Sequence, residues 1–382
     1  MQNLTVFPGS IESGRPESSD LALLGALCLF LSALDHLIPK PLPFMRIGLA
    51  NLPLLLALNI FPAKKYFALA FVKVLGQALV TGTLFSYIFL FSLAGTALSA
   101  VTMLLVYRSA SLVGTSIAGA FVSNAVQLIL ARFIVFGEGV LYLAPAFLAA
   151  GIASGGLLGF FAETFSAQSE WLRLKRSKAA AAGNNAECIE EAAAASGALA
   201  VTAKADANAP AGRSFAFSFR HIALLLMAAV FLMVPHLPVR AALFLFFWIL
   251  AIAVKRKTRP VFTIIGLVMI TACNLFPPYG KILFTVGPIT VAEGSLLRGL
   301  QRAVTLEGLI MFSKLALFSI PRLPGKFGGL LYECFGIVEK MNAIFFGARA
   351  ESPERKTKDK MKQDGNLIKK LDRLLCEISG YG

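Results

Sequence analysis

The stretch LFSYIFLFSLAGTALSAVTMLLVY, residues Leu84–Tyr107, contains no charged residue and decides the fold class of this chain. It is long enough to cross a bilayer as a helix, which takes ~20 residues. The whole chain of 382 residues has the same character, since 57% of them are hydrophobic and only 15% are charged. A soluble domain carries about 25% charged residues. The sequence therefore excludes a cytosolic protein and predicts an all-α, polytopic membrane protein.

Further apolar runs predict about ten transmembrane helices, about six in the first half of the chain and about four in the second. In the first half the expected spans are Leu21–Ile38, Gly48–Phe61, Tyr66–Thr81, Leu84–Tyr107, Leu112–Phe136 and Leu141–Phe165. In the second half they are His221–Pro235, Val239–Val254, Val261–Phe276 and Ile289–Ile320.

These runs predict four parts along the chain. Residues 1–165 form a six-helix membrane domain, and the Ala-rich, polar residues 166–218 form a flexible cytoplasmic linker. Residues 219–350 form a second bundle with cytoplasmic amphipathic coupling helices, and residues 351–382 form a charged cytoplasmic tail. Within this tail Leu367, Leu371, Leu374 and Leu375 recur at helical spacing, which predicts a small surface helix.

The net charge of +15 is distributed in clusters between the apolar runs. Lys64, Lys65, Arg108 and the cluster at 173–178 all fall on one side of the expected topology. Because positive residues favour the cytoplasmic side, we expect both termini inside a bacterial cytoplasmic membrane, surrounded by lipid. This placement argues against nucleic acid as a partner.

Several motifs with known chemistry are absent from the sequence. It contains no GxxxxGK[ST] phosphate loop, no paired carboxylates of the DDxxD type and no HExxH. The five cysteines lie far apart and form no CxxC. We therefore expect no catalytic residue, no metal and no cofactor in this chain, and any ATP and Mg²⁺ would be held by partner subunits.

Polar side chains at membrane depth indicate a ligand cavity. A buried cation costs several kcal/mol in a bilayer, so its usual place is the interior of a helix bundle. The alternative is that the cation reaches toward the headgroups while the amides only join helices. We expect a small anionic or amide-rich ligand, bound by Arg46, Asn51, Lys73, Gln77, Asn124 and Gln127.

Small residues indicate where helices approach closely. Gly151, Gly155 and Gly159 are expected to pack within the chain, whereas Ala22 and Ala26 could also face another subunit. A further motif, Ala348-Arg349-Ala350, follows the amphipathic segment Phe327–Phe346 and is a candidate for coupling to a partner.

The run Arg46-Ile47-Gly48-Leu49-Ala50-Asn51, with Gly82-Thr83 and Asn124-x-x-Gln127, resembles the Gx transporter family. That family is also labelled heptaprenyl diphosphate synthase component I, and it is similar to the substrate-binding S components of energy-coupling factor (ECF) transporters. Lys73 and Ser123 depart from the family, since they stand where Arg and His are expected.

The second half resembles the T component of the same transporters. The resemblance rests on ITVAEGSLLRGLQRAVTLEGLIMFSK, residues 289–314, and on the Ala-Arg-Ala motif. It implies a non-enzymatic importer subunit in which Ala22 and Ala26 meet the second domain. It also implies that Arg302, Ala348, Arg349 and Ala350 couple to ECF-type ATPase subunits.

Two other functions stay open at this stage. The family label suggests a membrane accessory component of polyprenyl diphosphate synthesis, in which Arg46 and Lys73 could bind a prenyl diphosphate. The chain could also be a scaffold of a flavin or redox complex in the membrane.

Overall fold

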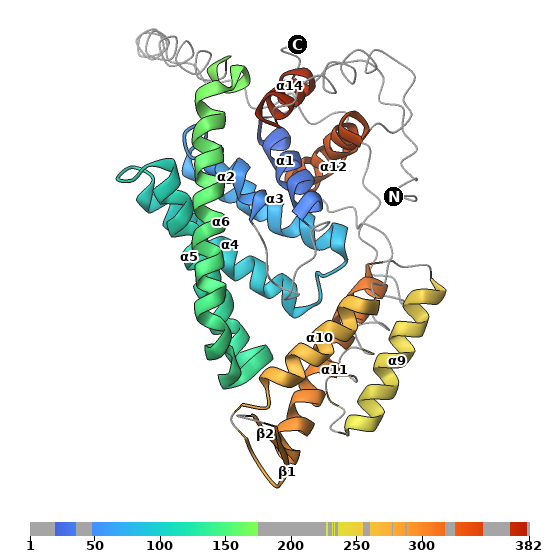
Figure 1. Ribbon diagram of the computed structural model, residues 1–382. Coiled ribbons are helices and arrows are strands. Elements are labelled where there is room, and N and C mark those ends of the chain that lie inside the picture. Colours follow the sequence, from blue (N-terminus) through green and yellow to red (C-terminus); the bar gives the residue numbers. More distant parts are fainter. Residues whose placement is uncertain are drawn as a thin grey trace, which may run out of the picture.

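The computed structural model describes residues 20–35, 48–174, 227, 231, 233, 236–254, 260–276, 278–286, 289–317, 325–346 and 367–379. These residues are almost entirely helical, which confirms the all-α class. Figure 1 shows two bodies of helices. The first body contains α1 to α6 together with α12 and α14, and the second contains α9 to α11 with a β-hairpin.

The helices of the first body follow the predicted spans, with one exception. The expected span Gly48–Phe61 is instead a 3₁₀ turn followed by a helix of six residues, too short to cross a membrane at 1.5 Å per residue. The elements are α1 (Asp20–Asp35), η1 (Leu49–Asn51), α2 (Leu52–Ala57), α3 (Ala63–Thr81), α4 (Tyr87–Val106), α5 (Leu112–Ala131) and α6 (Val140–Gln168).

Local chemistry sets the ends of these helices. The Ser111 hydroxyl caps α5 by accepting a hydrogen bond from the Gly114 N–H, at 3.2 Å. Gly82 ends α3 with a φ of 69°, a left-handed conformation that glycine adopts without strain. A π turn (Arg132–Phe136) and the 3₁₀ turn Gly137–Gly139 then reverse the chain between α5 and α6.

The glycines of α6 allow it to lie directly against α5. A Cβ at Gly159 would stand 2.6 Å from the Val113 Cα, and the Ser116 hydroxyl donates to the Gly155 carbonyl at 2.7 Å. The predicted glycine stripe therefore packs within the chain. The predicted linker begins too early, because α6 continues to Gln168 and Trp171 is fully buried.

The second body contains a β-hairpin that the sequence analysis missed. The strands β1 (Ile282–Val286) and β2 (Ile289–Ala292) pair antiparallel, so the expected helical span from Ile289 is wrong at its start. The β-branched residues on both sides of Gly-Pro were the available signal. The helices are α9 (Leu237–Ala253), α10 (Pro260–Cys273) and α11 (Glu293–Ala316).

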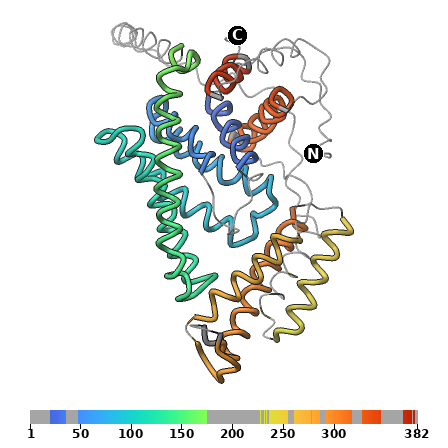
Figure 2. Tube along the Cα trace, viewed as in Figure 1, coloured from blue at the N-terminus to red at the C-terminus, as the bar shows by residue number. Residues whose placement is uncertain are grey.

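Two helices from the end of the chain pack onto its beginning. Figure 2 shows α12 (Gly325–Phe346) and α14 (Leu367–Ser379) beside α1. One hydrophobic core joins residues of α1, α12 and α14 with Trp171. The tail helix therefore uses its leucines for packing, since Leu371, Leu374 and Leu375 are all buried.

Two described stretches, Tyr87–Val106 and Leu112–Gln168, are long and apolar enough to cross a membrane. The second stretch comprises α5 and α6, which lie side by side. By itself this is weak evidence for a membrane protein. The arrangement of about ten spans in two bundles stays a prediction.

Candidate ligand cavity

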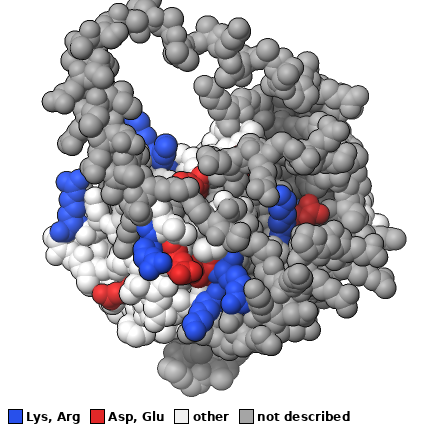
Figure 3. All heavy atoms as spheres, turned by 90° about the horizontal axis from the view of Figure 1, so that it is seen from above, with Lys and Arg blue, Asp and Glu red and all other residues white. Residues whose placement is uncertain are grey.

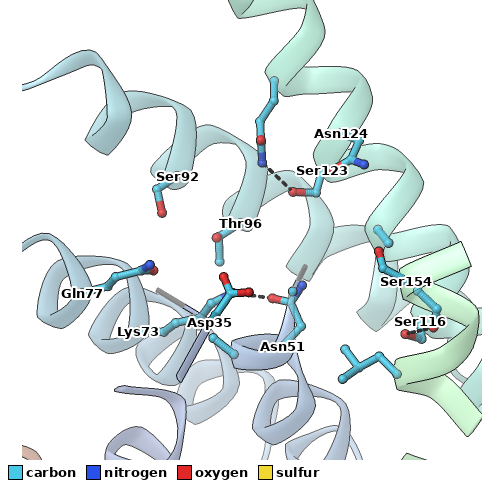
Figure 4. Close-up of a pocket in the computed structure, with 16 residues that line it drawn as sticks. Asp35, Asn51, Lys73, Gln77, Ser92, Thr96, Ser116, Ser123, Asn124 and Ser154 are labelled. Atoms are coloured by element: carbon cyan, nitrogen blue, oxygen red, sulfur yellow. Dashed lines mark hydrogen bonds between the residues drawn. The ribbon is translucent and has the colours of Figure 1, made fainter. Parts of the chain in front are cut away.

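A polar cavity lies between α1, η1, α3, α4, α5 and α6 (Figure 4). It encloses about 640 Å³, including its open mouth. Its described lining is dominated by amides and hydroxyls, with one ammonium and one carboxylate. The polar lining residues are Asp35, Asn51, Lys73, Gln77, Ser92, Thr96, Ser116, Ser123, Asn124, Gln127 and Ser154.

Lys73 and Gln77 reach the cavity from successive turns of α3. Lys73 is 5% exposed, and its ammonium donates a hydrogen bond to the Asn51 side-chain oxygen. The turn that presents Asn51 requires Gly48, whose φ is 89° and whose carbonyl accepts from the Asn51 N–H at 2.7 Å. Because Lys73 is buried, it does not extend to the surface of the molecule.

Asp35 is a lining residue that the sequence analysis missed. It ends α1, is 2% exposed, and lies on the same side of the cavity as Lys73 and Asn51 in Figure 4. The signal was a lone carboxylate after an otherwise uncharged run, Leu21 to Leu34. A single carboxylate forms no metal-binding pair of the DDxxD type, so motif patterns do not single it out.

The wall formed by α5 carries Ser123, Asn124 and Gln127. The Asn124 amide donates to the Phe147 carbonyl of α6 at 3.2 Å, so this side chain also joins two helices. The Gln127 amide nitrogen donates to the Ser123 hydroxyl at 3.2 Å. The Gln127 Oε1 atom is buried and accepts no hydrogen bond from the residues that the structure describes.

Hydroxyls from α4, α5 and α6 complete the lining. The Ser154 hydroxyl donates to the Gly151 carbonyl at 3.1 Å, while Ser92 and Thr96 face the cavity from α4 (Figure 4). The absence of a side chain at Gly95 leaves space for the α5 wall, since a Cβ there would stand 3.0 Å from the Gln127 Nε2. Sequence alone does not single out such hydroxyls, because serine and threonine are common on every face of an apolar helix.

Five of the six predicted binding residues therefore surround one cavity, namely Asn51, Lys73, Gln77, Asn124 and Gln127. The sixth, Arg46, lies outside the described residues. Within the described ranges no group of three or more His, Cys, Asp or Glu residues could hold a metal ion. The described lining offers hydrogen-bond donors and acceptors rather than metal ligands.

The residues predicted to couple the two domains are placed as follows. Ala22 and Ala26 are fully buried, and the Cys334 thiol of α12 donates to the Ala22 carbonyl at 3.4 Å. Arg302 donates to the Asn274 side-chain oxygen at 2.8 Å. The motif Ala348, Arg349 and Ala350 lies outside the described residues.

Asn274 forms one of the contacts between the second body and the first. Its amide nitrogen donates to the Val135 carbonyl at 2.9 Å, between α5 and α6. Farther along α11, the Ser313 hydroxyl accepts from the Phe85 N–H at 3.0 Å. The second body therefore contacts the α3–α4 and α5–α6 connections of the first.

The two halves of the chain match different protein families. Residues 24–165 match the family described as heptaprenyl diphosphate synthase component I, which confirms the resemblance predicted for the first domain. Residues 216–319 match a family described as a domain of unknown function, DUF8519, so the likeness to a T component stays a prediction. No curated protein and no solved structure matches the chain.

Proposed function

We propose that this chain is a multi-pass membrane subunit of an ECF-type importer, which binds a small molecule in the polar cavity and couples to separate ATPase subunits. The observation that carries the proposal is the cavity itself, where predicted polar residues from three parts of the chain converge inside an apolar body. Polar side chains in this setting mark a ligand pathway by default.

The surface of the first body supports a membrane location. Large apolar side chains point outward along α4 to α6, and a soluble protein rarely exposes so many together. Five of them are more than 65% exposed, namely Leu105, Phe133, Tyr142, Leu157 and Phe160. Such a belt suits contact with lipid tails.

The basic residues support one orientation. Lys64 and Lys65 at the start of α3, Arg108 after α4 and Arg173 after α6 are all exposed. Figure 3 looks onto the end of the molecule near α14, where Lys and Arg side chains lie among fewer acidic ones. We propose that this end faces the cytoplasm.

Coupling would pass through helix contacts already present in the fold. Motion of α12, driven by ATPase subunits that hold ATP and Mg²⁺, would reach the cavity through α1, because Ala22 and Ala26 are fully buried and the Cys334 thiol of α12 donates to the Ala22 carbonyl. The contact of α11 with the α3–α4 and α5–α6 connections provides a second route. Arg302, Ala348, Arg349 and Ala350 stay candidates for this coupling.

A second candidate function is an accessory role in polyprenyl diphosphate synthesis, which the family match over residues 24–165 favours. The described lining argues against a prenyl diphosphate in the cavity. Its apolar residues are Ala50, Ala120 and Leu158 besides two glycines, too few to enclose a prenyl chain. This candidate would therefore use another surface of the protein.

The test is affinity purification of the full chain from its native membranes, followed by mass spectrometry of bound proteins and small molecules. Co-purifying ATPases with a polar ligand would support the importer. A prenyltransferase partner would replace it with the second candidate, and flavin-transfer or redox proteins would indicate a scaffold. Lys73→Met should lose the small molecule and retain the proteins.

A further inference from the structure

The described cavity is balanced in charge. Lys73 and Asp35 are the charged residues of its described lining, they have opposite signs, and both are at least 95% buried. We propose that the cavity selects an uncharged or zwitterionic polar molecule that presents a hydrogen-bond donor to Gln127. The proposal rests on the cavity being the substrate site and replaces the expectation of an anionic ligand.

The two buried charges act differently on an anion and on a neutral ligand. An anion entering the cavity would gain attraction from the Lys73 ammonium but would meet the Asp35 carboxylate on the same side (Figure 4). Interactions between charges are strong in a buried site because little water screens them. A neutral ligand avoids this repulsion, and a zwitterion can use both charges.

The α5 wall carries a buried hydrogen-bond acceptor. Gln127 is 6% exposed, its nitrogen is bonded to Ser123, and its Oε1 has no partner in the described part of the chain. An acceptor left buried without a donor costs about 1–3 kcal/mol. A ligand N–H or O–H directed at this oxygen would remove that cost, so the α5 wall favours a donor group.

The remaining polar side chains of the lining combine hydrogen-bond donors and acceptors. The Ser92 and Thr96 hydroxyls and the Gln77 amide each carry donor and acceptor atoms, whereas the Ser116 hydroxyl donates to the Gly155 carbonyl and keeps its acceptor lone pairs. Such a surface matches a molecule with several alternating donors and acceptors. An ionised phosphate group, which brings acceptors alone, would use only the donor half of this surface.

The test uses pairs of compounds that differ in one charge. Purified full-length protein in lipid nanodiscs would be titrated with nicotinamide and nicotinate, with glutamine and glutamate, and with uridine and uridine monophosphate. Thermal stabilisation measures binding, and inorganic pyrophosphate is the anion reference. We expect a neutral or zwitterionic member to bind at least about tenfold more tightly than its anionic partner.

Two variants assign the preference to the cavity. Asp35→Asn should reduce the preference at least about fivefold, because the repulsion of the anion is removed. Gln127→Met should weaken the neutral member about tenfold by removing the acceptor. Gln168→Met, at an exposed position near the end of α6, is the matched control and should change neither. If the Asp35→Asn variant does not insert into the membrane, the compound pairs measured on the wild-type protein decide whether the cavity prefers neutral ligands.

Tighter binding of pyrophosphate or of the anionic members would overturn the proposal, and so would a lack of stabilisation by every neutral member. These failures are separate from failure of the importer role. Neutral binding without co-purifying ATPases would reject the importer and keep the ligand class. Co-purifying ATPases together with selective anion binding would keep the importer and reject the ligand class.

Discussion

Gln127 in the first body and Asn274 in the second are both buried amides in apolar surroundings, with 6% and 7% of their surface exposed. Asn274 uses both ends of its amide, since its nitrogen donates to the Val135 and Ile270 carbonyls and its oxygen accepts from Arg302. Gln127 uses only its nitrogen. Burial alone therefore does not separate the two amides, whereas the hydrogen bonding of their side-chain oxygens does.

The same contrast applies to the regions around them. Asn274 lies where the second body meets the first, at a contact so close that a Cβ on Gly139 would stand 1.9 Å from the Cys273 carbonyl oxygen. Gln127 lies beside open space. Substitutions at the junction should thus act on stability, and substitutions in the cavity should act on binding.

The largest effect is expected at the junction glycine. Gly139→Ala must displace the backbone carbonyl of Cys273, and such overpacking costs about 3 kcal/mol or more. The measurement is the thermal midpoint and the yield of monodisperse protein. Gly329→Ala is the matched control, because among the described residues no atom beyond its chain neighbours and its own helix backbone lies within 4 Å of the added Cβ, and it should be neutral or stabilise α12 by up to ~1 kcal/mol. Equal behaviour of the two variants would contradict the observed junction.

Asn274→Leu should rank next. It leaves the Val135 carbonyl and the Arg302 guanidinium without their partner and should cost about 2–3 kcal/mol of unfolding free energy. The affinity of the cavity should change less than about twofold, because none of these groups lines it. Denaturant unfolding and the nicotinamide titration measure the two effects. If Asn274→Leu lost much affinity and kept normal stability, the distinction between the junction and the cavity would be wrong.

Asp372→Ala tests how the tail is attached. The Asp372 carboxylate accepts from the Ser169 hydroxyl and from the backbone N–H of Glu170 and Trp171, at 3.0 and 3.2 Å for the latter two. Loss of this cap should cost about 1–2 kcal/mol and should speed proteolytic cleavage after residue 174. Lys369→Ala, on the exposed face of α14, should leave the cleavage rate unchanged.

Gln127→Met should change stability by less than about 1 kcal/mol, because loss of the hydrogen bond to Ser123 is offset by removal of a buried oxygen that has no partner among the described residues. Binding should nevertheless fall, as described for the cavity. Gln127→Met should therefore lower affinity and spare stability, whereas Asn274→Leu should lower stability and spare affinity. If Gln127→Met unfolds the protein, the amide is structural and the distinction between the two regions fails.

The smallest effect concerns the chemistry of Cys376 on α14. Burial, followed by the charges of Asp372 and Glu170, raises the pKa of this thiol from 9.0 to about 11. Since only the thiolate reacts, alkylation at pH 8 should be about a hundredfold slower than in the denatured chain. The folded state holds the proton more tightly, so this thiol lowers stability as the pH rises from 9.0 toward about 11. Peptide mass spectrometry after iodoacetamide treatment reads the rate, and an equal rate in both states would refute the raised pKa.

The sequence predicted the first-half helices from α3 to α6 within a few residues, because an uncharged run bounded by glycine, proline or basic residues is a local signal. It also selected Asn51, Lys73, Gln77, Asn124 and Gln127 as polar residues at unusual depth, since the cost of burying them is a property of each residue. Asp35, the hairpin at Ile282–Ala292 and the attachment of α14 were missed. Each depends on a contact with a distant part of the chain.

The sequence by itself thus determined the helical class and the polar residues that require a reason for burial. Only the tertiary structure decided that five of these residues face one space, that Asp35 joins Lys73 there, and that Asn274 is fully bonded elsewhere. Helix periodicity fixes which residues share a face, but not how that face is rotated against neighbours from other parts of the chain. That rotation follows from close contacts such as Gly159 on Val113, which no local pattern specifies.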